Sequence, residues 1–208
     1  MKLIQKSKNS LLKRLYFMRS ISMTETTQFD PNGLKFKIFN PKKHQLPKID
    51  FTQTNGQDPL SVQEYYDNCI LNGRSETNEV KYVIKYFENW IGFFSIDLTR
   101  LHIKQSEMNH QHGGEEVVQG EDRLPQLPIC ALLIRKIGID QRYRCYGIGK
   151  YIMLFCMGLA QTINKDKQIK LVIFKTTKSL AEKIYFPKYQ FNFTGTSGKL
   201  VWAFKRIC

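Results

Sequence analysis

Residues 136–150 read Lys-Ile-Gly-Ile-Asp-Gln-Arg-Tyr-Arg-Cys-Tyr-Gly-Ile-Gly-Lys. They follow an apolar run, residues 129–134, and lead into a segment of helical periodicity that ends near Asn164. A strand, a glycine-containing turn and a helix N-terminus form an anion-binding device, because the first helical N–H groups lack partners and the helix dipole favours negative charge. Gly147 and Gly149 let a phosphate approach the backbone without meeting a Cβ. We therefore expect a phosphorylated ligand.

Other glycine motifs fit this stretch less well. A dinucleotide-binding turn needs G-x-G-x-x-G and an acidic residue about 20 positions later. Here the next expected strand, residues 170–174, is followed by Lys175-Thr176. A P-loop is excluded because the chain has no G-x-x-x-x-G-K-[ST]. The pattern R-x-x-G-x-G taken alone leaves a simple tight turn open as an alternative.

The whole stretch 136–150 resembles, without a gap, the acetyl-CoA-binding motif of the GNAT family of N-acetyltransferases. It looks most like the branch that contains toxins of bacterial toxin–antitoxin pairs. Residues 90–96 resemble the third strand of that family, and the resemblance covers roughly residues 58–208. It implies acetyl-CoA as co-substrate, with a strand that pairs with the pantetheine arm and a turn that wraps the pyrophosphate. The residues implied in this binding are Ile137, Gly138, Ile139, Arg142, Arg144, Cys145, Tyr146, Gly147, Ile148, Gly149 and Lys150.

The order of expected elements predicts an α/β (α+β) fold with a mixed sheet and helices on both faces. Asp58-Pro59 is typical of a helix start, and Gly73 of its end. The near-continuous apolar run 127–140 indicates a central strand buried on both faces, parallel to the next strand because a helix connects them. The resemblance adds that these two parallel strands splay apart. The expected strands are 34–39, 80–87, 90–98, 127–140, 170–175, 191–193 and 199–207, and the expected helices are 58–71, 148–164 and a short one that ends at Tyr185.

The composition indicates one globular domain with a basic surface. The chain has 208 residues, 42% of them hydrophobic, and a formal charge of +14. Such a charge favours polyanionic partners, RNA above all, although it could equally be a solvated surface that only meets CoA phosphates. Residues 1–22 carry six Lys/Arg and no acid. They could be a mitochondrial presequence, a nucleic-acid-binding arm or the result of start-site choice, since Met23 is a plausible beginning. We therefore predict an extension, 1–22, and a GNAT-like domain, 23–208.

Cysteine usage and hydropathy indicate a soluble protein of a reducing compartment. The five cysteines lack C-x-x-C spacing, which argues against a disulfide framework and a zinc site. His110 and His112 lie in a polar insertion, residues 102–126, and no third ligand stands beside them, so no metal is expected. No apolar run reaches the roughly 18 residues of a membrane span. We expect a cytoplasmic protein, or a mitochondrial one if residues 1–22 are a presequence.

The resemblance also implies a tyrosine that gives a proton to the departing thiolate. The family pattern is approximately A-x-x-F-Y-x-K-x-G-F, and this chain reads Ala181-Glu-Lys-Ile-Tyr-Phe-Pro-Lys-Tyr-Gln-Phe191. Counting forward from Ala181 assigns the role to Tyr185, whereas counting back from Phe191 gives Phe186. An inserted residue, such as Pro187, reconciles the two counts. We assign Tyr185, and we note that Gln190 replaces the usual glycine.

No general base is evident; Glu88, Asp97 and Glu182 are candidates that nothing ranks. Deprotonating a lysine amine of pKa near 10.4 costs roughly 4–5 kcal/mol at pH 7, and an α-amine near 7.8 costs about 1 kcal/mol. A site without a strong base therefore favours α-amines, and aminoacyl-tRNA offers such an amine on a polyanion.

Three functions follow from these observations. The first is an acetyl-CoA-dependent N-acetyltransferase of the toxin type acting on aminoacyl-tRNA, with an antitoxin as partner and a homodimer as a further expectation. The second is acetylation of a protein N-terminus, a lysine or a small amine. The third is a degenerate acetyltransferase domain that acts as a basic binding module in a ribonucleoprotein or organelle complex.

Overall fold

The computed structural model describes residues 29–53, 55–74, 78–101, 129–194 and 199–207. The chain divides into two compact units, residues 1–32 and 33–208. The predicted boundary after residue 22 and the insertion 102–126 lie outside the described residues. The strands are β1 (Leu34–Ile38), β2 (Val80–Tyr86), β3 (Asn89–Leu101), β4 (Ile129–Ile139), β5 (Ile169–Thr177), β6 (Asn192–Thr194) and β7 (Leu200–Arg206). The helical elements are η1 (Pro31–Gly33), α2 (Val62–Tyr65), η2 (Tyr66–Leu71), η3 (Gln141–Tyr143), α4 (Ile148–Lys167), α5 (Lys178–Leu180), η4 (Ala181–Tyr185) and α6 (Phe186–Tyr189).

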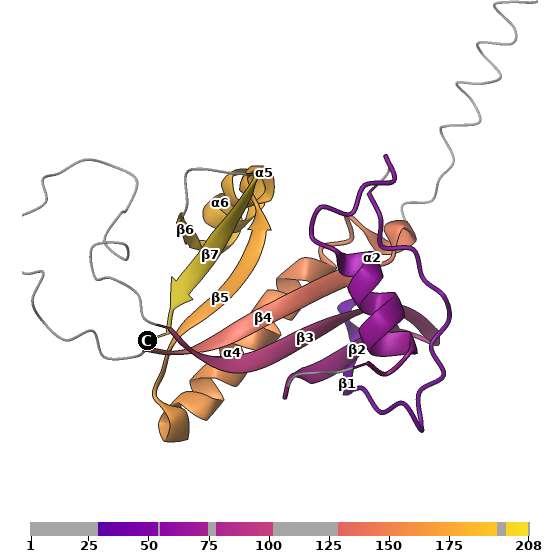
Figure 1. Ribbon diagram of the computed structural model, residues 1–208, viewed down its shortest axis with the longest axis horizontal. Helices are drawn as coiled ribbons and strands as arrows, with labels where there is room; N and C mark the ends of the chain where they lie inside the picture. The colour runs from indigo at the N-terminus through magenta and orange to yellow at the C-terminus, as the bar shows by residue number, and fades with distance from the viewer. Residues whose placement is uncertain (1–28, 54, 75–77, 102–128, 195–198, 208) are drawn as a thin grey trace, which may run out of the picture. The chain divides into compact units, whose positions relative to one another are not determined.

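The seven described strands form one mixed sheet in the order β1-β2-β3-β4-β5-β7-β6 (Figure 1). The pair β4–β5 is parallel, and α4 connects its two strands. The other neighbours are antiparallel. The predicted fold class is confirmed, including the central position of β4 and the C-terminal hairpin.

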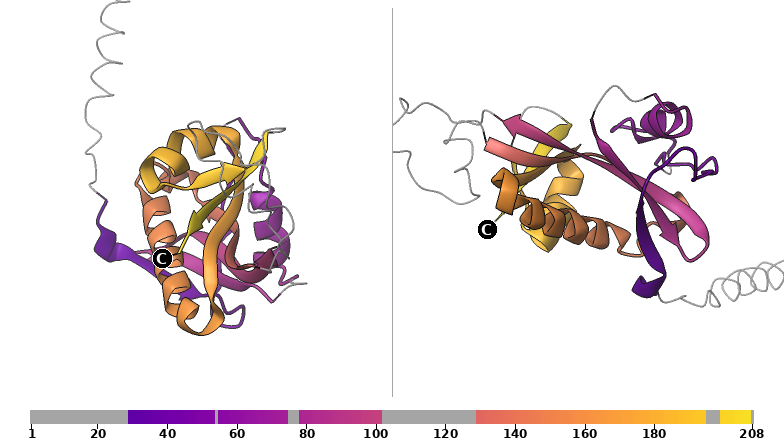
Figure 2. Two further views of the ribbon diagram at one scale, coloured as in Figure 1. Left: turned by 90° about the vertical axis from the view of Figure 1, so that its left-hand side faces the viewer. Right: turned by 90° about the horizontal axis from the view of Figure 1, so that it is seen from below.

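Helices cover both faces of this sheet, as the view from below in Figure 2 shows for α2 and α4. Phe93 of β3 points to the α2 side, where its ring lies 5.6 Å from Tyr65 and 5.2 Å from Phe51. The next residue, Phe94, points to the other side and lies 5.6 Å from Phe155 of α4. Because side chains alternate along a strand, each strand residue can be assigned to the α2 face or the α4 face from its place in the register.

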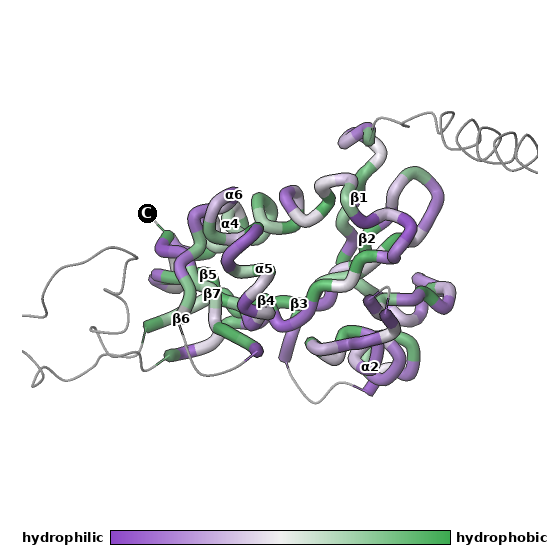
Figure 3. Tube along the Cα trace, turned by 90° about the horizontal axis from the view of Figure 1, so that it is seen from above, coloured by the Kyte–Doolittle hydropathy of each residue, from purple (hydrophilic) through white to green (hydrophobic). Residues whose placement is uncertain are grey.

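Helix α4 begins at Ile148 as the apolar spacing predicts. Ile148, Ile152, Cys156 and Ala160 form its fully buried line, and Phe155 flanks that line, half-buried. Figure 3 shows hydrophobic residues recurring along α4, β4 and β5 with hydrophilic residues between them. The helix ends at Gln168, which adopts a left-handed conformation with φ 51°.

The first helix starts later than predicted. Asp58 does cap it, since its carboxylate accepts from the N–H groups of Val62 and Gln63, both at 2.7 Å. However, the left-handed Ser61, with φ 50°, separates Asp58 from the first helical residue, Val62. The prediction that Pro59 occupies the first helical position is therefore wrong. Asp58-Pro59 instead belongs to a loop that caps the helix from outside.

The helix after β5 extends past Pro187 to Tyr189, although a proline normally ends a helix. The preceding segment, Ala181–Tyr185, is a π-helix. A π turn takes up one extra residue and removes the need for the α-helical hydrogen bond that Pro187 cannot donate. The inserted residue inferred from the sequence is thus accommodated here. Gln190 then adopts the left-handed conformation, φ 57°, that a glycine takes without strain.

Gly92 of β3 determines how closely β3 and β4 approach each other. A Cβ added there would lie 2.3 Å from the carbonyl oxygen of Gly138, which is backbone and cannot move aside alone. We expect Gly92→Ala to destabilise the protein by about 2 kcal/mol through overpacking. That loss lowers the melting temperature by roughly 4–8 °C in a chain of this size, measured by circular dichroism.

Gly158→Ala is the matched control, because a Cβ at this exposed position on α4 meets no atom within 4 Å. This variant should melt at or above the wild-type temperature, since alanine favours helix over glycine by about 1 kcal/mol. A Gly92→Ala protein that melts with the wild type would contradict the close approach of β3 and β4.

Candidate functional site

The parallel pair β4–β5 separates partway along its length. The register joins Cys130 through Ile134 to Ile169 through Phe174 and stops there. Beyond this point β4 pairs only with β3, and β5 pairs only with β7. We call these unpaired facing edges, residues 135–139 of β4 and 175–177 of β5, the split. Backbone groups on these edges can pair with a ligand, because strand N–H and C=O groups need partners, but the Ile139 carbonyl already accepts from Arg144.

A β-bulge in β4 coincides with the start of the split. Ser95 of β3 pairs with Lys136 and the next residue, Ile96, pairs with Ile134, so Arg135 is an extra residue on β4. A bulge bends its strand and increases the local twist. The bulge at Arg135 therefore turns β4 away from β5 where their pairing ends. The predicted splaying of the two strands is present in the structure.

The turn after β4 leads directly into α4. Cys145 and Gly147 both have positive φ, 68° and 76°. A Cβ added at Gly147 or Gly149 would meet no atom within 4 Å, and Gly147 caps α4 without any side-chain hydrogen bond. The helix N-terminus is thus not covered by protein atoms at these two glycines. Its geometry suits an anion that binds backbone N–H groups.

Asp140 fixes the beginning of this turn. It is 4% exposed, and its carboxylate accepts from the Arg142 backbone N–H at 2.9 Å and from the Arg142 guanidinium at 2.7 Å. Burial alone would raise the pKa of Asp140, but the hydrogen bonds and charge of Arg142, with the charge of Arg144, hold it below its ordinary value. The carboxylate therefore stays ionised and holds the turn at neutral pH.

Arg144 makes three hydrogen bonds within the protein, and its predicted phosphate contact stays a prediction. Its guanidinium donates to the carbonyls of Ile139 at 3.1 Å, Thr52 at 2.9 Å and Phe51 at 2.8 Å. Gln141 adds a hydrogen bond to the Thr52 carbonyl at 2.8 Å. These bonds tie the turn to the segment before α2. Arg142 remains a candidate for phosphate, because its side chain is 78% exposed despite the pair with Asp140.

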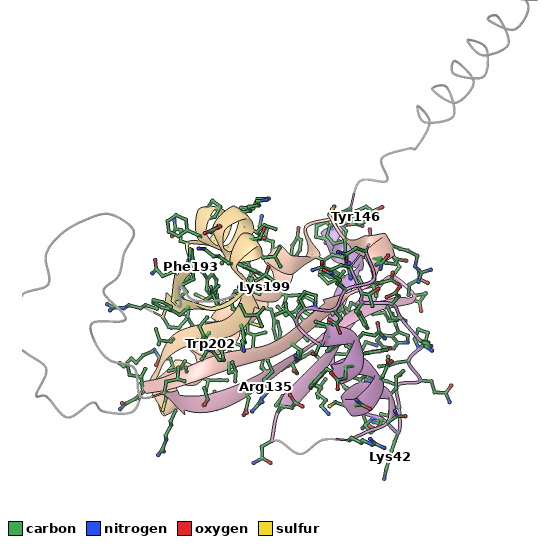
Figure 4. The ribbon with its side chains drawn as sticks, turned by 45° about the horizontal axis from the view of Figure 1, so that its top comes forward. Lys42, Arg135, Tyr146, Phe193, Lys199 and Trp202 are labelled. Atoms are coloured by element: carbon green, nitrogen blue, oxygen red, sulfur yellow. The ribbon has the colours of Figure 1, made fainter. Side chains whose placement is uncertain are left out.

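The remaining predicted cofactor residues lie along β4 and the turn. Gly138 is required by packing, because a Cβ there would lie 2.5 Å from the Phe93 ring. Ile137 and Ile139 are half-buried on the split edge of β4. Cys145, Tyr146 and Lys150 are exposed around the turn, and Ile148 is buried under α4. Figure 4 shows Tyr146 at this end of the molecule.

Tyr185 lies at the level of the split on the α4 face. Its ring is 4.6 Å from that of Phe174, the last β5 residue that pairs with β4. Burial, with a smaller contribution from Tyr189, raises the pKa of Tyr185 to about 12. The hydroxyl therefore keeps its proton at neutral pH and can donate it. Phe186, the alternative from the backward count, is 40% exposed.

The three candidate bases are all engaged in ion pairs. Glu88 is 91% exposed and lies 2.6 Å from Lys85. The hydrogen bond and charge of Lys85 lower the pKa of Glu88. Glu182 lies 3.9 Å from Lys178, and Asp97 lies 2.9 Å from Arg135. Asp97 lies beside the split through this pair, because Arg135 is the first unpaired residue of β4.

Sequence reasoning missed a buried polar cluster under α2. The Tyr65 hydroxyl, the Ser95 hydroxyl and one carboxylate oxygen of Glu79 are buried without a hydrogen bond of ordinary geometry. Burial, together with the facing Glu79 carboxylate, raises the pKa of Tyr65 strongly. Alternation in β3 places Ser95 on this face, but no local pattern indicates that Glu79 is buried there.

In the described ranges no group of three His, Cys, Asp or Glu residues could hold a metal ion. His110 and His112 lie outside those ranges. Among the described residues no helix is long and apolar enough to span a bilayer.

No protein-family model matches this sequence, and no curated protein matches it. Its fold is shared with solved structures of bacterial toxins. A structure described as a bacterial toxin has 12% identity and a TM-score of 0.60, with 84% of this chain and 90% of the other covered. AtaTR bound with acetyl-CoA has 10% identity and a TM-score of 0.60, covering 85% and 95%. AtaT complexed with acetyl-methionyl-tRNAfMet has 9% identity and a TM-score of 0.59, covering 83% and 94%. These similarities confirm the predicted GNAT-like fold.

The ion pair between Asp140 and Arg142 generates a testable pH dependence. Because the folded pKa of Asp140 is lowered, its stabilisation is complete above the unfolded value of 3.8 and is lost as the pH falls through the folded value. We expect Asp140→Asn to lose about 1 kcal/mol at pH 7, a modest figure because solvent screens the exposed Arg142. The loss should shrink below about pH 4, measured by urea denaturation.

Glu88→Gln is the control, since this exposed acid also has a lowered pKa but lies outside the turn. Its urea midpoint at pH 7 should equal that of the wild type. A constant difference between Asp140→Asn and the wild type from pH 7 to pH 3 would argue against an ionised Asp140.

Proposed function

We propose that this protein transfers an acetyl group from acetyl-CoA to a primary amine, and that the amine is the α-amine of aminoacyl-tRNA. The observation that carries the proposal is the split between β4 and β5 with the uncovered turn at its end. An extended ligand arm with a terminal diphosphate satisfies both features at once. The arm pairs with a free strand edge, and the diphosphate binds the N-terminus of α4.

The proposal assigns binding to the backbone of β4 and the turn. The edge of β4 at Ile137, Gly138 and Ile139 pairs with the pantetheine amides, except for the Ile139 carbonyl, which is bound to Arg144. Residues 145–150 surround the pyrophosphate. Arg142 and Lys150 are exposed and can meet phosphate charges. Arg144 holds the turn in place through its three carbonyl contacts. The co-substrate supplies an activated acetyl thioester.

Tyr185 is the proposed proton donor. Its raised pKa, about 12, keeps the hydroxyl protonated at physiological pH. In the transfer, the amine nitrogen bonds to the thioester carbonyl carbon, the C–S bond breaks and the sulfur takes the phenolic proton. The nitrogen then releases one proton to solvent, and the phenolate takes a proton back from solvent. The amine must have lost its own proton first. Asp97, a candidate base beside the split, is already paired with Arg135 at 2.9 Å. This arrangement favours an amine of low pKa over a lysine.

The structural neighbours support a nucleic-acid acceptor and a protein partner. One of them is AtaT with acetyl-methionyl-tRNAfMet, another is AtaTR with acetyl-CoA, and a third is AtaT with the C-terminus of the antitoxin AtaR. The formal charge of +14 suits a polyanionic acceptor. We extend the proposal to an antitoxin partner and to the cytoplasm, where acetyl-CoA and aminoacyl-tRNA occur together.

Gly149 tests the binding half of the proposal. A Cβ there meets no protein atom within 4 Å but enters the space that a phosphate would occupy. We expect Gly149→Ala to leave the melting temperature unchanged or slightly raised and to weaken acetyl-CoA binding about ten-fold, measured by calorimetry. Gly158→Ala on the same helix should bind acetyl-CoA as the wild type does. Equal affinities of Gly149→Ala and the wild type would remove the turn from the binding site.

Tyr185 tests the chemical half. Labelled acetyl-CoA incubated with aminoacyl-tRNA should give labelled RNA, and Tyr185→Phe should lower kcat by about 100-fold or more, the usual contribution of a positioned acid. Tyr189→Phe is the control, because this neighbouring tyrosine is not assigned to the reaction. Label on protein with none on RNA would transfer the proposal to protein amines. The absence of any acetyl-CoA binding would reject acetyl transfer and leave a binding module.

A further inference from the structure

A row of three side chains crosses the sheet at the start of the split. Leu133, Ile173 and Phe204 lie side by side on β4, β5 and β7 and contribute to one hydrophobic cluster. The next row on the same face, toward the open end of the split, consists of Arg135, Lys175 and Trp202. Lys175 pairs directly with Trp202 of the antiparallel strand β7. Because residues two apart on a strand point to the same face, Lys175 and Trp202 share the face of that cluster.

The row formed by Arg135, Lys175 and Trp202 is exposed, unlike the apolar row beside it. Ile173 and Phe204 are 4% and 6% exposed, whereas Trp202 is 45% exposed and Lys175 is also exposed. An exposed aromatic side chain and an exposed cation thus lie next to each other at the open end of the split. Figure 4 shows Trp202, Lys199 and Arg135 on the side of the sheet turned to the viewer. Lys199 directly precedes β7 and is exposed.

The cations around this row differ in whether they already have partners within the protein. Arg135 is paired with Asp97 at 2.9 Å and lies 4.0 Å from Glu79. Lys136 donates to the Leu60 carbonyl, and burial lowers its pKa while Asp58 and Glu64 oppose the shift. Lys175 has no ion pair with any described residue. Lys175 is therefore a cation that faces solvent beside Trp202, and the exposed Lys199 lies three residues before Trp202 in the chain.

The row lies on the opposite face of the sheet from Tyr185. Phe174 contacts Tyr185, so its neighbour Lys175 points the other way. A ligand in the split would have the proton donor on one face and the row on the other. The acceptor amine can therefore approach from the face that carries Trp202.

We infer that Trp202, Lys175 and Lys199 form a binding platform for the single-stranded 3′ end of an RNA acceptor. A nucleobase stacks on the exposed indole, which is how aromatic side chains hold unpaired bases. The two lysines pair with the flanking phosphates. The inference rests on the proposed function, since it names where that acceptor binds.

Tryptophan fluorescence provides a direct test. The chain has two tryptophans, so Trp90→Phe leaves Trp202 as the only one. Titration of this full-length variant with a short single-stranded RNA that ends in CCA should quench the fluorescence with saturation. Lys175→Gln in the same background should weaken binding several-fold and reduce the slope of log affinity against log salt by about 0.7. A blunt duplex RNA should not quench, because it has no free base to stack.

Lys170→Gln is the matched control, since Lys170 is an exposed residue of the same strand that lies before the split. It should bind the single strand like its parent. Absence of quenching, equal quenching by the duplex, or equal losses in Lys175→Gln and Lys170→Gln would each overturn the inference.

A kinetic measurement separates this inference from the proposed function. In the wild-type background Trp202→Ala should raise KM for aminoacyl-tRNA about ten-fold, the cost of one stacked base, with kcat within two-fold. Trp202→Phe should recover most of the loss. RNA quenching without any acetyl transfer would leave the platform standing and reject the proposed reaction. Acetyl transfer with an unchanged KM in Trp202→Ala would support the proposed reaction and reject the platform.

Discussion

The end of pairing between β4 and β5 is the constraint on which the site depends. A parallel pair that continued to the ends of both strands would satisfy its own backbone groups and leave nothing for a ligand. Here each strand continues with a different partner: β4 stays with β3 through Ile139, and β5 stays with β7 through Thr177. Separate packing stabilises the two halves. Phe93 with Tyr65 and Tyr66 holds one half, and Phe174 with Tyr185 and Phe191 holds the other. The split therefore persists without a ligand to hold it open.

The charged side chains of the turn mainly stabilise the turn itself. Asp140 binds Arg142, and Arg144 donates hydrogen bonds to carbonyls of β4 and of residues 51 and 52. Under the proposed function, a diphosphate is recognised by backbone N–H groups at the start of α4, which are fixed in direction and need no reorganisation. This division of roles explains why glycine stands at 147 and 149, while arginines stand close by without covering them.

Local patterns predicted the elements of this fold well, because strand alternation and helical periodicity report directly on burial. The features that sequence reasoning missed depend on contacts between distant segments. Arg144 reaches Thr52 and Phe51 across 92 and 93 positions, so its role could not be read from residues 136–150. The buried environment of Glu79 depends on α2 lying above it in the same way. Ser61 and the π-helical Ala181–Tyr185 were missed for another reason: both are local distortions that caps and periodicity do not encode.

The π turn connects the sequence anomaly to the geometry of the site. The chain carries one residue more than the family pattern between Ala181 and Phe191, and a regular helix would rotate every later side chain by about 100° for each added residue. The wider turn takes up that residue locally. Phe191, which follows the extra residue, still packs on the Phe174 ring, 5.1 Å away. The Tyr185 ring, which precedes Pro187, contacts the same Phe174 at the level of the split. Gln190 keeps the left-handed conformation that the usual glycine would adopt. The departures at Pro187 and Gln190 thus alter the backbone around Tyr185 while its ring remains beside the split, which is the placement that its proposed role as proton donor requires.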